Sequence, residues 1–176
     1  ERPVVKIYDE VVLPALSLAE HDWHNDRLDQ AKQASVRQAV RDLVEEVGEK
    51  PRKISADQPE QEAVHDETGG YEGCILCLPA RDPADEIAAM MLAQTLEREG
   101  YCAEYVSVER LASEYLELVE KKSVQVVMIS ALPPAAVTHA RYLVKRLRSR
   151  FPELKVIVGL WTMRGNFERA KERLES

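Results

Sequence analysis

The sequence predicts an α/β protein: a doubly wound, flavodoxin- or Rossmann-like parallel sheet preceded by two helices. From residue 71 onward, short apolar segments alternate with amphipathic segments of helical period, which is the pattern of repeated βαβ units. The segments VQVVMIS (124–130) and KVIVGLW (155–161) are almost continuously apolar. Such runs are typical of parallel strands that are buried on both faces.

The alternation predicts a sheet of four or five strands. We expect strands at 74–79, 102–108, 124–131 and 155–161, and helices at 83–99, 109–121, 133–150 and 167–174. Sheets of this kind bind ligands beyond the carboxyl ends of their strands. The candidate edge therefore comprises residues 79–85, 107–109, 130–134 and 159–164.

Residues 1–48 are predicted to form a helical cap of two helices, each with one apolar face. Pro14 predicts a kink in the first helix, HNDRLD (24–29) a turn with Asp29 as helix cap, and Gly48 the end of the second helix. The apolar stripe of the second helix is expected to contain Val36, Val40, Leu43, Val44 and Val47. Residues 49–70, rich in Pro, Glu and Gly, predict a flexible linker to an α/β domain over 71–176.

Composition excludes several classes of function. A net charge of −7 among 176 residues argues against nucleic-acid binding, which requires clustered Lys and Arg. No apolar run approaches the roughly 18 residues of a membrane span, and no signal peptide is visible. The chain begins at Glu1 rather than Met, so we expect it to be part of a longer protein. Three cysteines without framework spacing predict a reducing cytosol.

The C-x-x-C at Cys74–Cys77 is interpreted as strand packing. Side chains three positions apart on a strand point to opposite faces, so these two sulfurs cannot meet. We expect both to behave as small buried hydrophobes. Cys102 has no partner in this pattern.

The loop after the first strand predicts helix capping rather than a phosphate or metal site. It contains no glycine; Asp82 is the expected N-cap, followed by Pro83, and Asp85 and Glu86 occupy the first turn. Those carboxylates would repel an anion and stabilise the helix end themselves. No nucleophile–base pair or metal spacing is apparent, so neither an enzyme nor a metal site is predicted.

Several segments resemble a cobalamin-binding module, a helical cap followed by a flavodoxin-like domain. IYDEVVLPALSLAEHDWHNDRLD (7–29) resembles the first cap helix and its Trp-containing turn, and LEREGYCAEYV (96–106) a helix-to-strand junction. ISAL (129–132) resembles the family's Ser-x-Leu through Ser130 and Leu132, and VIVG (156–159) the start of its Gly-Gly turn through Gly159. The resemblance implies that Tyr8 and Trp23 lie on the cap face turned to the corrin.

The departures from that family pattern fall on the cofactor site. The family's Asp-x-His-x-x-Gly aligns with residues 83–88, so Asp85 stands where the cobalt-ligating His is needed and Ala88 where Gly is. Leu160 replaces the second Gly of the turn, and Trp161 follows it. We therefore expect a scaffold without cofactor; a corrinoid sensor or carrier that lacks the His ligand is the alternative.

Three segments together resemble the cytosolic C-terminal extension of autoinducer-2 exporter-like (PerM-family) bacterial permeases: IYDEVVLPALSLAEHDWHNDRLD (7–29), CILCLPARDPADEIAAMMLAQTLEREG (74–100) and ARYLVKRLR (140–148). This resemblance implies a non-catalytic regulatory or interaction domain attached to a transmembrane permease, cytoplasmic and tethered to the inner membrane. A small molecule, or a second copy of the chain, is compatible with it. The candidate edge site comprises Arg81, Asp82, Asp85, Ser130, Leu132, Gly159, Trp161 and Arg164.

Overall fold

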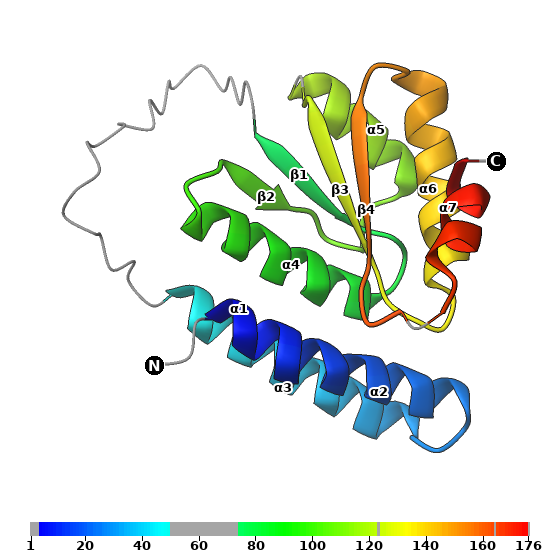
Figure 1. Ribbon diagram of the computed structural model, residues 1–176. Helices are drawn as coiled ribbons and strands as arrows, with labels where there is room; N and C mark the ends of the chain where they lie inside the picture. The colour runs from blue at the N-terminus through cyan, green and yellow to red at the C-terminus, as the bar shows by residue number, and fades with distance from the viewer. Residues whose placement is uncertain (1–3, 50–73, 123, 164, 176) are drawn as a thin grey trace.

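The computed structural model describes residues 4–49, 74–122, 124–163 and 165–175 (Figure 1). The cap contains α1 (Val4–Ile7), the π-helical turn η1 (Tyr8–Val12), α2 (Leu13–His24) and α3 (Gln30–Glu49). The α/β part contains β1 (Ile75–Pro79), α4 (Pro83–Arg98), β2 (Ala103–Tyr105), α5 (Ala112–Lys121), β3 (Val126–Ala131), α6 (Ala136–Arg150), β4 (Lys155–Leu160) and α7 (Phe167–Glu175). The predicted linker, 49–70, lies outside the described residues except for Glu49.

The predicted fold class is confirmed. The described strands form a parallel sheet in the order β2-β1-β3-β4. The strand after β1 is added on one side of it and the later strands on the other, so the topological switch point lies between β1 and β3. Register places Pro79 opposite Ser130 and Ser130 opposite Gly159. The carboxyl ends of the three strands β1, β3 and β4 therefore meet at one edge, where loops carrying the candidate residues begin.

Helices cover both faces of the sheet. Leu76 and Leu78 of β1 point into a core shared with α5 and α6, whereas Cys77 between them packs against Ala89 and Ala93 of α4. Figure 1 shows α4 lying between the cap helices and the sheet. The helix α4 is consequently buried on two sides, which explains its nearly continuous run of buried residues from 84 to 91.

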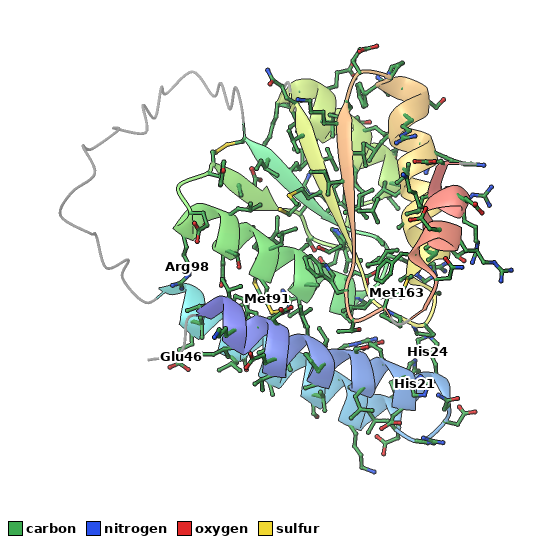
Figure 2. All side chains as sticks on the ribbon, viewed as in Figure 1. His21, His24, Glu46, Met91, Arg98 and Met163 are labelled. Carbon is green, nitrogen blue, oxygen red and sulfur yellow. A yellow bond between two sulfur atoms is a disulfide. The ribbon has the colours of Figure 1, made fainter. Side chains whose placement is uncertain are left out.

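The cap packs on α4 through an apolar cluster. Leu16 and Val44 are fully buried there, in contact with a group that contains Ile87, Ala88 and Met91. Figure 2 shows Met91 on the side of α4 that faces the cap. This burial holds the cap helices on α4, because a helix with one apolar face cannot bury that face by itself.

Three details of the cap differ from the prediction. The irregularity near Pro14 is the π-helical turn η1 immediately before α2, because a proline lacks the N–H that would continue the α-helical ladder. The helix α3 continues one residue past Gly48. Leu43 is exposed, because the stripe that meets α4 is narrower than predicted. Asp29 caps α3 as expected, accepting a hydrogen bond from the Lys32 N–H at 2.8 Å.

Three elements of the α/β part are shorter than predicted. The strand β2 ends at Tyr105, and beyond it the backbone N–H of Val108 donates to Glu86 of α4. The helix α5 begins only after Leu111, whose N–H donates to Glu114 at 2.6 Å. The helix α6 begins at Ala136 rather than at 133, because Pro133 precedes another proline and is therefore disfavoured in the α-helical conformation.

The prediction that Cys102 has no partner is wrong. Cys74 immediately precedes β1, Cys102 immediately precedes β2, and the two form a disulfide across the neighbouring strands with a Cα–Cα distance of 4.7 Å. Cys74 and Cys77 do not pair, as predicted, and Cys77 is a buried free thiol. The error arose because pairing was sought within a strand rather than between strand starts.

Among the described helices, none is long and apolar enough to cross a membrane.

Candidate functional site

Asp85 is the central side chain of the predicted edge. It lies in the first turn of α4 and is 2% exposed. Its Oδ2 accepts hydrogen bonds from the backbone N–H groups of Arg81 and Asp82, both at 3.0 Å, and its Oδ1 accepts one from Leu132 at 2.7 Å. The carboxylate thus completes the capping of α4 and ties the loop after β1 to the loop after β3.

Burial dominates the ionisation of Asp85. Desolvation raises the pKa of its carboxyl to about 6, and the three backbone N–H donors oppose that rise because they favour the charged form. Both oxygens are occupied by the protein itself, so this carboxylate has little capacity left for another ligand.

Leu132, which donates to this carboxylate, lies two residues after Ser130. Leu132 is buried in the cluster between cap and sheet. Ser130 is fully buried at the end of β3, and its Oγ has no hydrogen-bond partner among the described residues. A buried hydroxyl without a partner is uncommon in folded proteins.

Gly159 and Trp161 form one unit at the end of β4. A Cβ added to Gly159 would lie 2.8 Å from the indole carbons Cε2 and Cζ2 of Trp161, so the indole covers the face of the glycine. The rest of Trp161 packs against the cap cluster. Its Nε1 is buried without a partner among the described residues.

The predicted cap residues differ in position. Tyr8 is buried in the cluster that joins the cap to α4, and its hydroxyl donates to Gln94 Oε1 at 2.5 Å. Trp23, near the end of α2, is half-buried and does not belong to that cluster. The structure therefore does not bring Trp23 together with Tyr8 at the edge of the sheet.

A cleft of about 990 Å³ separates α2 from the loops after β3 and β4. Leu13, Ser17 and His21 line it on the cap side, and Pro134 and Met163 on the opposite side. Figure 2 shows His21 and Met163 near one end of the cap. A hydrogen bond of 2.8 Å from Thr162 to Ser17 connects the two walls. The volume lies in the range of small-molecule sites.

Glu86 has a role that the sequence did not reveal. Its Oε1 accepts a hydrogen bond from Arg41 of α3 at 2.8 Å, and its Oε2 accepts one from the backbone N–H of Val108 at 2.8 Å. One buried carboxylate thus joins the cap, α4 and the loop after β2. The prediction that Glu86 only caps α4 is incomplete. Arg41, a cation close to the predicted apolar stripe of α3, was the available signal.

Asp82, Asp85 and His139 approach one another closely enough to resemble a metal site. Their ligand atoms lie within 4.8 Å of one another. The occupied oxygens of Asp85 argue against this role, and Asp82 is paired with His139 Nδ1 at 3.5 Å. Burial lowers the pKa of His139, opposed by the carboxylate of Asp82. The remaining predicted residues are Arg81, whose side chain lines a different cavity beside α5 and α6, and Arg164, which lies outside the described residues.

The comparison with known families agrees with this geometry. Residues 73–159 match the family model of the B12 binding domain. The match supports a cobalamin-binding-like module over this part of the chain. The match ends at Gly159, so the cap and Trp161 lie outside it. No curated protein matches the chain.

Proposed function

We propose that the chain is a non-catalytic regulatory domain of a bacterial membrane permease, built on a cobalamin-binding scaffold that has lost its cobalt-ligating His. The observation that carries the loss of the ligand is the environment of Asp85. Imidazole is a good ligand of cobalt, and a carboxylate is a poor replacement. In addition, this carboxylate is bound by three backbone N–H groups.

Crowding of the edge supports the same proposal. The indole of Trp161 covers Gly159, where a nucleotide tail would need open backbone. Ala88 is buried against the cap in place of a glycine that would admit the tail. The residues present therefore do not fit cobalamin bound through a lower His ligand.

The second candidate is a corrinoid sensor or carrier that binds without a His ligand. It is favoured by the match of residues 73–159 to the B12 binding domain and by the unpartnered hydroxyl of Ser130. The cleft of about 990 Å³ between cap and edge adds space for a ligand. These observations bear on the scaffold. Asp85 and Trp161 bear on the cobalt ligand and on the space for the nucleotide tail, which cobalamin binding requires directly, so the first candidate is preferred.

The regulatory role rests on the contact between cap and α/β part. An occupant of the cleft would separate α2 from Thr162 and Met163, and the cap would move relative to the sheet. Such a movement could pass to an attached membrane segment. The permease context itself rests on the resemblance of the segments around 7–29, 74–100 and 140–148.

Cobalamin binding is tested by mixing the purified chain with hydroxocobalamin and, in the dark, with adenosylcobalamin. After desalting, the visible spectrum is recorded. We expect a colourless protein with either form. Stoichiometric colour would overturn the loss of the cofactor and make the corrinoid sensor the leading function. Circular dichroism of the same sample shows whether the colourless protein is folded.

The permease context is tested in cells of the source bacterium with an antiserum raised against this chain. We expect the antiserum to detect a much larger protein in the inner-membrane fraction. A product of the size of the chain itself, found only in the soluble fraction, would contradict the tether. This result is independent of the cobalamin spectrum.

A further inference from the structure

A second cavity, of about 520 Å³, lies between the start of α5 and α6. We call it the α5–α6 notch; it is lined by Ala80, Arg81, Val108, Arg110, Leu111, Ala112, Tyr115, Thr138, His139, Tyr142 and Leu143. It opens on the face of the sheet covered by α5 and α6, whereas the cap packs on α4 on the other face. The notch shares Thr138 with the cleft beside the cap, and all their other lining residues differ.

The charged side chains of the notch are all basic. Arg81 enters from the loop after β1 and Arg110 from the loop after β2, and His139 of α6 lies between the same walls. No described residue that lines the notch is acidic, and no ion pair joins either arginine to a carboxylate among the described residues. In a chain of net charge −7, two arginines from different loops thus line one cavity, at whose margin the carboxylate of Asp82 is paired with His139 at 3.5 Å.

The other walls of the notch are apolar and aromatic. Leu111 is 68% exposed and Tyr142 is 60% exposed, which is high for large apolar side chains of a folded domain. The hydroxyl of Tyr115 donates to the carbonyl of Ser107 at 3.1 Å, so this group is already satisfied. On Tyr142, the guanidinium of Arg146 lies 5.3 Å from the ring centroid. This contact orients the tyrosine and adds positive charge.

We propose that the α5–α6 notch binds a small aromatic anion, such as an aromatic carboxylate or the phosphate ester of an aromatic ring. The anionic group lies between Arg81 and Arg110, where planar guanidinium groups can each donate two hydrogen bonds to one oxyanion. The ring lies against Tyr142 and Leu111. A volume of about 520 Å³ suits such a ligand. This site does not depend on whether the cap-side cleft binds a corrinoid.

The probe for this site is 8-anilinonaphthalene-1-sulfonate, an aromatic anion whose fluorescence rises in an apolar site. We expect saturable binding to the folded wild-type chain at one site. Arg81→Gln and Arg110→Gln should each raise the dissociation constant at least tenfold. The matched control is Arg148→Gln, which removes the same charge from an exposed position of α6 that lines a different groove, beside α7. It should change the constant less than twofold.

Competition distinguishes an anion site from a merely apolar one. Benzoate should displace the dye, whereas benzamidine, of nearly the same shape and opposite charge, should not. Absence of saturable binding, binding unchanged in both Arg81→Gln and Arg110→Gln, or equal displacement by benzamidine would each overturn the proposal. Arg81 and Arg110 are exposed, so both variants should fold, and circular dichroism verifies this.

Discussion

The carboxylate of Asp85 accepts a hydrogen bond of 2.7 Å from the backbone N–H of Leu132, 47 residues along the chain. This bond connects the start of α4, which follows β1, to the residue after β3, and the topological switch point of the sheet lies between β1 and β3. A residue that stands where a cobalt ligand is expected thus has a structural role of its own. The proposed loss of the cobalt ligand and the observed bond to Leu132 therefore involve the same side chain.

Replacement of Asp85 by Ala should lower the free energy of unfolding by about 3 kcal/mol, because one buried and two partly buried backbone N–H groups lose their acceptor. Asp85→Asn should cost less, since the amide oxygen can still accept. Asp85→His, which introduces the imidazole that the sequence resemblance expects here, should be destabilised like Asp85→Ala. Urea denaturation measures these differences, with the exposed Asp42→Ala as the matched control. An Asp85→Ala variant with the same free energy of unfolding as wild type would contradict the structural role.

The raised pKa of Asp85 predicts a pH dependence of stability. Because the folded-state pKa, about 6, exceeds the ordinary aspartate pKa of 3.8, the folded protein holds this proton more tightly than the unfolded chain. The corresponding stability is fully present below pH 3.8 and is lost as the pH rises through 6, by about 3 kcal/mol in total. As the pH rises from 4 to 8, the unfolding free energy of wild type should therefore fall relative to that of Asp85→Asn. A flat difference would contradict the shift.

The bond between Arg41 and Glu86 should hold the cap on the α/β part. Arg41→Ala leaves the Glu86 carboxylate, 6% exposed, without its cation and should cost roughly 2–3 kcal/mol. Arg150→Ala breaks an exposed pair with Glu120 and should cost at most about 0.5 kcal/mol. Hydrogen exchange should accelerate across residues 4–49 in Arg41→Ala only. Unchanged exchange in the cap would show that the apolar cluster alone holds it.

The contact between Gly159 and Trp161 predicts a coupled pair. Gly159→Ala should cost about 1–3 kcal/mol, because the new methyl group collides with the indole. In a Trp161→Val background the same substitution should cost much less. A double-mutant cycle based on urea denaturation measures the coupling. Additive effects would show that the indole of Trp161 is not the reason why position 159 requires glycine.

Patterns local in sequence predicted most of the fold. The continuous apolar strands gave β3 and β4 to within two residues, and helical period gave α4 and α7 to within one. The alternation of elements also predicted the parallel sheet. These features depend on residues close together in the chain, whose periodicity is visible without a structure.

The site was predicted less completely, because its contacts join distant residues. Asp85 was singled out, but its bond to Leu132 and the bridge from Arg41 through Glu86 to Val108 span separate elements. Charged residues in a first helical turn are ordinarily caps, which concealed the wider role of Glu86. The notch was missed for the same reason: Arg110 and Tyr142 line one cavity with Arg81 only after folding.

The disulfide between Cys74 and Cys102 is the clearest difference from the sequence-based expectation, and it is directly testable. It closes a segment with a sequence separation of 28 that contains β1, Asp85 and α4. Loss of the cross-link should cost about 3 kcal/mol, which corresponds to a fall in Tm of roughly 6–12 °C for a chain of this size. Dithiothreitol should lower the Tm of wild type and of Cys77→Ala but leave Cys102→Ser unchanged. Three reactive thiols in the unfolded, unreduced protein, with a Tm insensitive to reductant, would restore the prediction of a fully reduced chain.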